Sequence, residues 1–174
     1  MRRGAEADAD ATRRENWTRA GLRAVVQRVR SASVSVGDEA AAEIGQGLVV
    51  MIGVGADDRA QDGERLARKI VELRLFEDYR GRLHHSVADI GGAILAVPQF
   101  TLYGDIGRGR RPDFTHAAPP DRGRALFDAF CGALRALDAR VEAGRFGAHM
   151  RIKMDADGPV TIVASTDTWT EGHV

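Results

Sequence analysis

Two proline-containing stretches, LAVPQFTLYGD (95–105) and MDADGPVTIVAS (154–165), lie where the sequence otherwise predicts β-strands. Pro98 interrupts the first apolar run, and the Gly158-Pro159 pair stands where the second should begin. A proline removes a ladder donor, so a strand tolerates it only at an end, at a sheet edge or in a bulge. We therefore expect the backbone at these two irregular places to form the active site.

The segments around these stretches predict a single compact α/β domain with about eight strands and two main helices. The apolar run at 45–55 indicates a buried strand, and the alternation at 31–37 indicates a strand with one solvent face. Further strands are expected at 22–29, 93–104, 148–154 and 159–165. We expect them to form a mixed or antiparallel, barrel-like sheet.

Each helix is predicted from an apolar stripe. Leu66, Ile70 and Leu73 recur at helical spacing within 57–76. The second helix, within 121–141, follows two prolines and could be capped by Asp121. Its stripe comprises Leu126, Phe127, Phe130, Leu134, Leu137 and Val141.

The composition narrows the class of protein. The 174 residues are 44% hydrophobic and carry a formal net charge of zero, so net charge gives no argument for binding nucleic acid or membrane. No apolar run is long enough for a membrane helix, and a single cysteine fits a reducing cytoplasm. We expect a disordered N-terminal extension over 1–21, the domain over 22–165 and a frayed tail over 166–174.

The common catalytic and cofactor signatures are missing from the sequence, so we expect no cofactor. His84 and His85 are adjacent and would point to opposite faces of a strand, which makes a poor metal site, and we expect no metal. Cys131 falls among the apolar residues of the second helix and is better explained as a core residue than as a nucleophile.

Two features remain open from the residues alone. Thr101 could be a nucleophile, but no base stands near it in sequence, and the alternative is an ordinary β-branched strand residue. The loop 105–120 carries Arg108, Arg110 and Arg111 with two glycines, which suits phosphate binding or a solvated basic turn.

Four motifs in order resemble the D-aminoacyl-tRNA deacylase (D-tyrosyl-tRNA deacylase) family. They are RAVVQRV (23–29), PQFTLYGD (98–105), GRRPDF (109–114) and FGAHMRIKMDADGPVTI (146–162). The resemblance implies a homodimer that hydrolyses the ester joining a D-amino acid, or glycine mischarged on alanine tRNA, to the 3′ end of tRNA. Aminoacyl-tRNA is thus the implied partner.

The resemblance also implies which residues form the site. The catalytic motif falls on Gln99, Phe100 and Thr101. The chirality filter falls on Gly158 and Pro159, joined by a cis bond that reaches into the partner's pocket. Supporting positions fall on Arg28, Pro98 and Ala156. We assign tRNA binding to the arginines of the basic loop.

Two positions depart from the family pattern. Pro98 replaces a serine and Ala156 replaces an asparagine. A proline before Gln-x-Thr resembles a sister group with relaxed chirality that also handles L-alanyl-tRNA. The alternatives are therefore a relaxed deacylase acting on glycyl- or L-alanyl-tRNA and a non-catalytic RNA-binding module with the same fold.

Overall fold

The structure is a computed structural model that describes residues 21–107 and 109–168. The described residues form eight strands, two α-helices and two short 3-10 helices. In chain order they are β1 (Arg23–Val36), β2 (Glu39–Ile44), β3 (Gly47–Gly53), α2 (Ala60–Glu72), β4 (Phe76–Glu77), β5 (Leu83–His85), β6 (Ala93–Pro98), η1 (Phe100–Tyr103), α3 (Pro120–Ala136), β7 (Arg140–Ala143), β8 (Met150–Ser165) and η2 (Thr166–Thr168).

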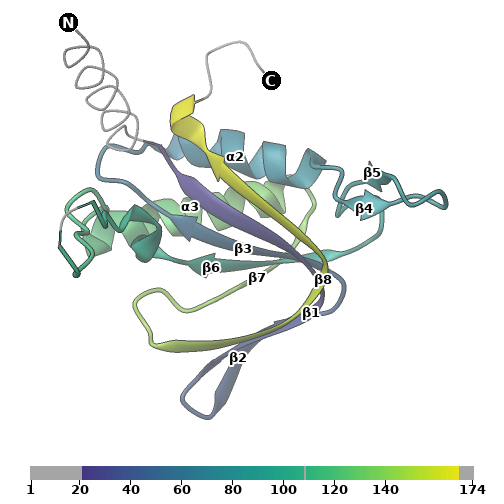
Figure 1. Cartoon of the computed structure of the whole chain (residues 1–174), viewed down its shortest axis with the longest axis horizontal. Coiled ribbons are helices and arrows are strands. Elements are labelled where there is room, and N and C mark those ends of the chain that lie inside the picture. Colours follow the sequence, from purple (N-terminus) through teal and green to yellow (C-terminus); the bar gives the residue numbers. More distant parts are fainter. Residues whose placement is uncertain (1–20, 108, 169–174) are drawn as a thin grey trace, which may run out of the picture.

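The main sheet has six strands and is built around β1 (Figure 1). One side of β1 pairs with β8 along its whole length, and the other side pairs with β3 and then with β2. Strands β6 and β7 continue the sheet in parallel beyond β3. The expected mixed, barrel-like sheet is confirmed, and it is nearly closed. The strands predicted at 22–29 and 31–37 are one strand, as are those at 148–154 and 159–165, because each pair continues without a turn.

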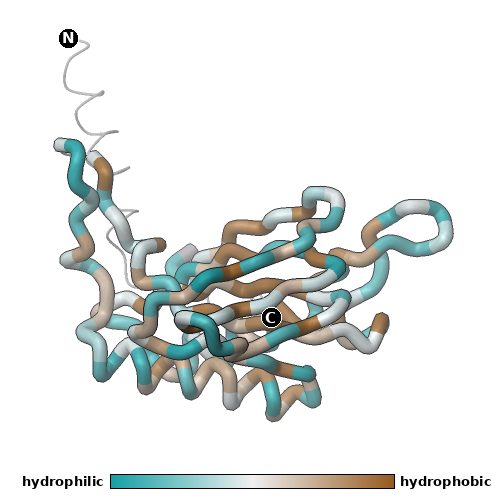
Figure 2. Tube along the Cα trace, turned by 90° about the horizontal axis from the view of Figure 1, so that it is seen from below, coloured by the Kyte–Doolittle hydropathy of each residue, from teal (hydrophilic) through white to brown (hydrophobic). Residues whose placement is uncertain are grey.

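Alternating residues of the central strands supply two cores. Leu48 and Val50 of β3 face the two helices, whereas Val49 of the same strand faces the opposite side. There the far halves of β1, β2 and β8 curl over β6 and bury Leu95 and Val97 (Figure 1). In Figure 2 the helices form one layer below the strands. Both faces of β3 and β6 are buried, which explains their continuous apolar sequences.

The helices differ from expectation at their ends. Leu66 and Ile70 are buried as predicted, but Leu73 is the C-cap of α2. Helix α3 begins at Pro120 with Pro119 as N-cap, so Asp121 is not the cap. Val141 belongs to β7 rather than to the helix stripe. The last change follows from the turn at Leu137–Asp138, where Asp138 has a left-handed φ of 60°.

The expected strand over 93–104 ends at Pro98, and the four residues Phe100–Tyr103 form the 3-10 helix η1. Proline explains the stop, because it offers no ladder N–H. Within the predicted tail 166–174, Thr166–Thr168 form η2, and Thr166 N–H donates to Leu22 O at 3.0 Å. Residues 1–20 and 169–174, the rest of the two predicted terminal segments, lie outside the described residues. Among the described residues, no helix is both long and apolar enough to cross a membrane.

Candidate active site

The first expected motif forms a tight turn at the end of β6. Gln99 N–H donates to Ile52 O at 2.7 Å, which anchors the turn to the neighbouring strand β3. Phe100 and Thr101 then open η1 and are exposed. The first N–H groups of a helix have no acceptor within it, so those of Phe100 and Thr101 are free to point at a ligand.

The Thr101 hydroxyl accepts a hydrogen bond from the Gln99 side-chain amide. An amide cannot take up a proton, so this neighbour does not activate the hydroxyl as a nucleophile. The alternative of an ordinary strand residue is wrong, because Thr101 lies in the 3-10 helix η1.

A buried tyrosine holds this turn from below. Tyr103 is 3% exposed, and its hydroxyl donates to Gly21 O and lies 3.4 Å from Asp58 Oδ2. The Arg23 guanidinium stacks 4.1 Å above the Tyr103 ring and donates to Leu102 O at 3.1 Å. The turn is therefore fixed to β1 and to the loop after β3. No local pattern predicts these contacts, because Asp58 and Tyr103 are 45 residues apart in the chain.

Burial perturbs the acids of this cluster. Desolvation raises the pKa of the Asp58 carboxyl, although Gly55 N–H donates to its Oδ2 at 2.7 Å. Desolvation, with the nearby Asp58 charge, also raises the pKa of the Tyr103 hydroxyl. Tyr103 is therefore a neutral hydrogen-bond donor at physiological pH, and Arg23 adds a positive charge to the support of the turn.

The second expected motif is a bulge in β8. Gln27 pairs with Thr161 and Val29 pairs with Ala156, so Arg28 alone faces the stretch Asp157–Val160. The Gly158–Pro159 peptide bond is cis, as the resemblance implied. Both residues are exposed, so this stretch of backbone faces outward.

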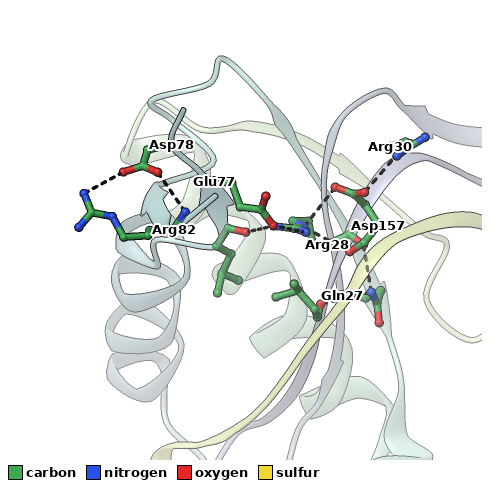
Figure 3. Close-up of polar contacts among 9 residues, drawn as sticks. Gln27, Arg28, Arg30, Glu77, Asp78, Arg82 and Asp157 are labelled. Carbon is green, nitrogen blue, oxygen red and sulfur yellow. Dashed lines mark hydrogen bonds and ion pairs between the residues drawn. The ribbon is translucent and has the colours of Figure 1, made fainter. Parts of the chain in front are cut away.

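The buried Arg28 binds the bulge to the rest of the domain (Figure 3). Its side chain is 5% exposed, and its Nε lies 3.2 Å from Asp157 O and 3.3 Å from Asp157 Oδ2. Nη1 donates to Leu75 O at 2.7 Å, and Nη2 lies 3.4 Å from Glu77 Oε1. Gln27 adds a bond from Nε2 to Val160 O at 3.2 Å. The sequence did not indicate the parts played by Gln27 and Glu77.

Only glycine fits at position 158. Its φ is +119°, and an added Cβ would lie 2.9 Å from Val160 N and 3.1 Å from Arg28 Nη2. The absence of a side chain thus lets the main chain approach the guanidinium and the following strand. Ala156, the departure from the family's asparagine, is exposed and pairs with Val29.

The two motifs do not meet within one chain. Pro98 pairs with Ile52, Ile52 with Ala24 and Ala24 with Ala164, so these residues share one row of the sheet. Pro159 lies five residues before Ala164 and three strands away from Pro98. With about 4.8 Å between strands and about 3.3 Å per residue, the motifs are on the order of 20 Å apart.

The basic loop lies against the first motif. Phe114 contacts Phe100 edge-on with ring centroids 5.1 Å apart, and Asp105 and Asp113 close the loop by paired backbone hydrogen bonds. Arg110 and Arg111 are exposed at its tip, and Arg108 lies outside the described residues.

Cys131 is buried as predicted, and burial raises the pKa of its thiol to about 11. It is therefore a protonated core residue at neutral pH. Among residues 21–107 and 109–168, no three His, Cys, Asp or Glu side chains are grouped to hold a metal ion.

The model of the D-Tyr-tRNA(Tyr) deacylase family matches residues 25–165. The chain belongs to this family. D-aminoacyl-tRNA deacylase of Roseiflexus sp. (strain RS-1) is 51% identical over 150 residues, covering 86% of this chain and 97% of the relative. The Thermotoga petrophila D-aminoacyl-tRNA deacylase is 52% identical over 142 residues, covering 82% of this chain and 95% of the relative.

Solved structures agree with the family's fold. A "c-Myc DNA Unwinding Element Binding Protein" superimposes with a TM-score of 0.76 at 40% identity, covering 82% of this chain and 97% of the other. A probable eukaryotic D-amino acid tRNA deacylase superimposes with a TM-score of 0.74 at 21% identity, covering 83% of this chain and 99% of the other. This second likeness concerns the fold alone.

Proposed function

We propose that this protein hydrolyses the ester bond of D-aminoacyl-tRNA and so removes wrong-handed amino acids before translation. The observation that carries the proposal is identity of about half the residues to D-aminoacyl-tRNA deacylases over nearly their whole length. The substrate is made in the cytoplasm, where we place the protein.

We further propose that the enzyme is a homodimer whose site is shared between protomers. The separation of the two motifs within one chain supports this arrangement, because the turn and the bulge of one chain are too far apart to contact the same substrate atoms. Phe100 is 57% exposed and Val163 of β8 is 80% exposed, so apolar surface lies close to both motifs. In a two-fold dimer, the Gly158–Pro159 bulge of one protomer would enter the pocket beside the other's turn.

In the proposed mechanism the RNA supplies the reactive group. The free 2′-hydroxyl beside the 3′-ester can position or activate a water molecule at very high effective concentration. The N–H groups of Phe100 and Thr101 then stabilise the developing oxyanion, each contributing roughly 3 kcal/mol when preorganised. Gln99 holds the Thr101 side chain, and neither residue needs to act as a base.

Handedness is read by main-chain atoms in this proposal. Rigid carbonyls around Gly158 capture the substrate amino group and leave no space for an L side chain. The clamp by Arg28 supports this role, because it fixes Asp157 O immediately before the glycine. A filter without side chains tolerates many D-amino acids and admits glycine.

The basic loop would then guide the RNA to the site. Arg110 and Arg111 stand beside the turn through the Phe100–Phe114 contact, and Arg108 belongs to the same loop. Arginines of this kind suit phosphate contacts.

Pro98 favours one alternative, a relaxed deacylase that also accepts L-alanyl-tRNA. Loss of ester from D-Tyr-tRNA, L-Tyr-tRNA, L-Ala-tRNA and Gly-tRNA distinguishes the possibilities. We expect rapid loss from D-Tyr-tRNA and Gly-tRNA and retention of both L esters. Loss of the L-alanyl ester would favour the relaxed enzyme, and stability of every ester would leave only an RNA-binding module.

A further inference from the structure

A small hairpin projects from the domain next to the Gly-Pro bulge. Strands β4 and β5 form a two-stranded sheet separate from the main one, and their connecting tip, Asp78–Arg82, extends away from the body (Figures 1 and 2). Tyr79 at the tip is 88% exposed. The proposed mechanism makes no use of this residue, and its ring packs on no core element.

The tip is held in one shape by its own hydrogen bonds. The Asp78 carboxylate accepts the N–H groups of Arg80 at 2.8 Å and Arg82 at 3.0 Å. Asp78 N–H donates to Arg82 O at 2.8 Å, and Gly81, with φ of +72°, donates to Asp78 O at 3.0 Å. These bonds, chiefly that from Arg82 N–H, lower the pKa of Asp78, so the carboxylate stays charged. The exposed ring is therefore presented on a preorganised turn.

Two guanidinium groups accompany the ring. That of Arg80 lies 5.1 Å from the Tyr79 ring centroid, and Arg82, 68% exposed, lies 3.3 Å from Asp78 Oδ2. An exposed aromatic face beside arginines suits a nucleobase, which stacks on the ring while its phosphates meet the cations. A protein partner would instead need a larger apolar patch, and only Leu83, 49% exposed, accompanies the ring.

The position of the hairpin links it to the site. Arg28 binds Leu75 O and Glu77 at the base of the hairpin and Asp157 in the bulge (Figure 3). The base of the hairpin and the Gly158–Pro159 bulge are thus both bound to the buried guanidinium of Arg28. An RNA whose 3′ end lay at the bulge would therefore come near the hairpin as well.

We propose that the β4–β5 tip is an RNA-contact surface on which Tyr79 stacks against an unpaired nucleotide of the substrate tRNA. This inference rests on the proposed function, because that function supplies the RNA and its single-stranded 3′ end. It adds a contact outside the two catalytic motifs and the basic loop.

The test measures binding of uncharged RNA, which requires no hydrolysis. Two fluorescent acceptor-stem hairpins are compared by anisotropy with the full chain, one with its unpaired 3′ strand and one blunt. Tyr79→Ala should raise the Kd for the first RNA about tenfold and leave the blunt RNA unchanged. Tyr79→Phe, which keeps the ring, should bind like the wild type. Arg80→Ala should lower the salt slope for the first RNA by about 0.7.

Several outcomes would overturn the inference. An unchanged Kd for Tyr79→Ala would exclude the contact, and an equal loss on both RNAs would exclude stacking on an unpaired base. A changed mass in light scattering with unchanged RNA binding would make the tip a protein contact instead. Since Tyr79 is 88% exposed, the alanine variant should unfold at the wild-type urea midpoint. Ester hydrolysis by the wild type is assayed separately, so failure of the proposed function is distinguishable from failure of this contact.

Discussion

The two motifs of the site are both pieces of irregular backbone, but the protein fixes them by different chemistry. The turn at Phe100 and Thr101 rests on a buried, neutral tyrosine and a stacked arginine. The bulge at Gly158 is held by one buried guanidinium whose partners include two carboxylates. Asp58 approaches the turn only through the Tyr103 hydroxyl, whereas a carbonyl group of the bulge is bound directly by the Arg28 cation. At each motif, rigidity therefore comes from a side chain placed behind the backbone.

The largest loss should follow from breaking the clamp behind the bulge. Arg28→Met would leave Asp157 O and Leu75 O without their donor, and the Asp157 carboxylate would keep only its contact with the exposed Arg30, at 3.4 Å. We expect a loss of about 3 kcal/mol in the free energy of unfolding, since one partner of a mostly buried ion pair is removed. Arg28→Lys should recover little, because an ammonium lacks the planar fork. Urea unfolding of both variants measures the free energy of unfolding. Wild-type stability of Arg28→Met would show that the contacts of Arg28 do not stabilise the domain.

Adding one methyl group to the bulge should come next. Gly158→Ala at φ +119° meets Val160 N and Arg28 Nη2. Strain of about 1–3 kcal/mol is expected, and displacement of the carbonyls should cut D-Tyr-tRNA hydrolysis about 100-fold. Gly37→Ala is the matched control, because Gly37 also has a positive φ, +58°, but open space around it. The control should lose stability and keep full activity; equal activity in the two variants would contradict a role for the bulge.

A smaller effect is expected at the turn. Tyr103→Phe removes the hydroxyl that donates to Gly21 O and should cost about 1–2 kcal/mol of stability. The turn would lose its support, so kcat should fall several-fold while KM for tRNA stays the same. Steady-state kinetics of D-Tyr-tRNA hydrolysis provide the measurement. A change confined to KM would mean that Tyr103 serves RNA binding instead.

The smallest expected effect is a change in pH dependence. The pKa of Asp58 is raised above its ordinary 3.8, so the folded protein holds this proton more tightly than the unfolded chain. Its contribution to stability is therefore full below pH 3.8 and is lost as the pH rises through the folded-state pKa. Relative to the wild type, the free energy of unfolding of Asp58→Asn should increase between pH 4 and pH 7. Urea unfolding over this pH range measures the difference. A difference that does not vary with pH would contradict the raised pKa.

The sequence predicted the helices and strands of the fold better than the residues at which they begin and end. Alternation and apolar runs were enough for the main strands, and the stripe of Leu66 and Ile70 was enough for α2. Pro98 was correctly expected to be a strand irregularity, but the 3-10 helix after it depends on anchoring by Ile52 from another strand. Val141 was misassigned because the stripe of α3 continues past the turn at Asp138.

For the site, the sequence indicated the backbone pieces and, through the resemblance, the support from Arg28, but it missed the supports from Tyr103, Gln27 and Glu77. Gly158, Pro159 and Arg28 came from the resemblance, and the structure brings Arg28 to within 3.2 Å of Asp157 O. Tyr103 is part of the motif PQFTLYGD, but no neighbouring residue in the sequence predicts its hydrogen bond to Gly21 O, 82 residues away. Contacts of this kind depend on tertiary packing, and a single sequence carries no periodicity that marks them.

The central claim is that the turn of one protomer works with the bulge of the other. Two variants test it, Gly158→Ala and Phe100→Pro, the second of which removes one proposed oxyanion donor; Phe100→Ala keeps that N–H and serves as its control. Each variant alone should be nearly inactive on D-Tyr-tRNA.

The decisive measurement is the activity of an equal mixture of the two inactive variants after subunit exchange. In a mixed dimer, one site combines a wild-type turn with a wild-type bulge from the partner. Random pairing then predicts recovery of about one quarter of the wild-type rate per protomer. No recovery, with mixed dimers demonstrated by mass, would contradict a site shared across the interface.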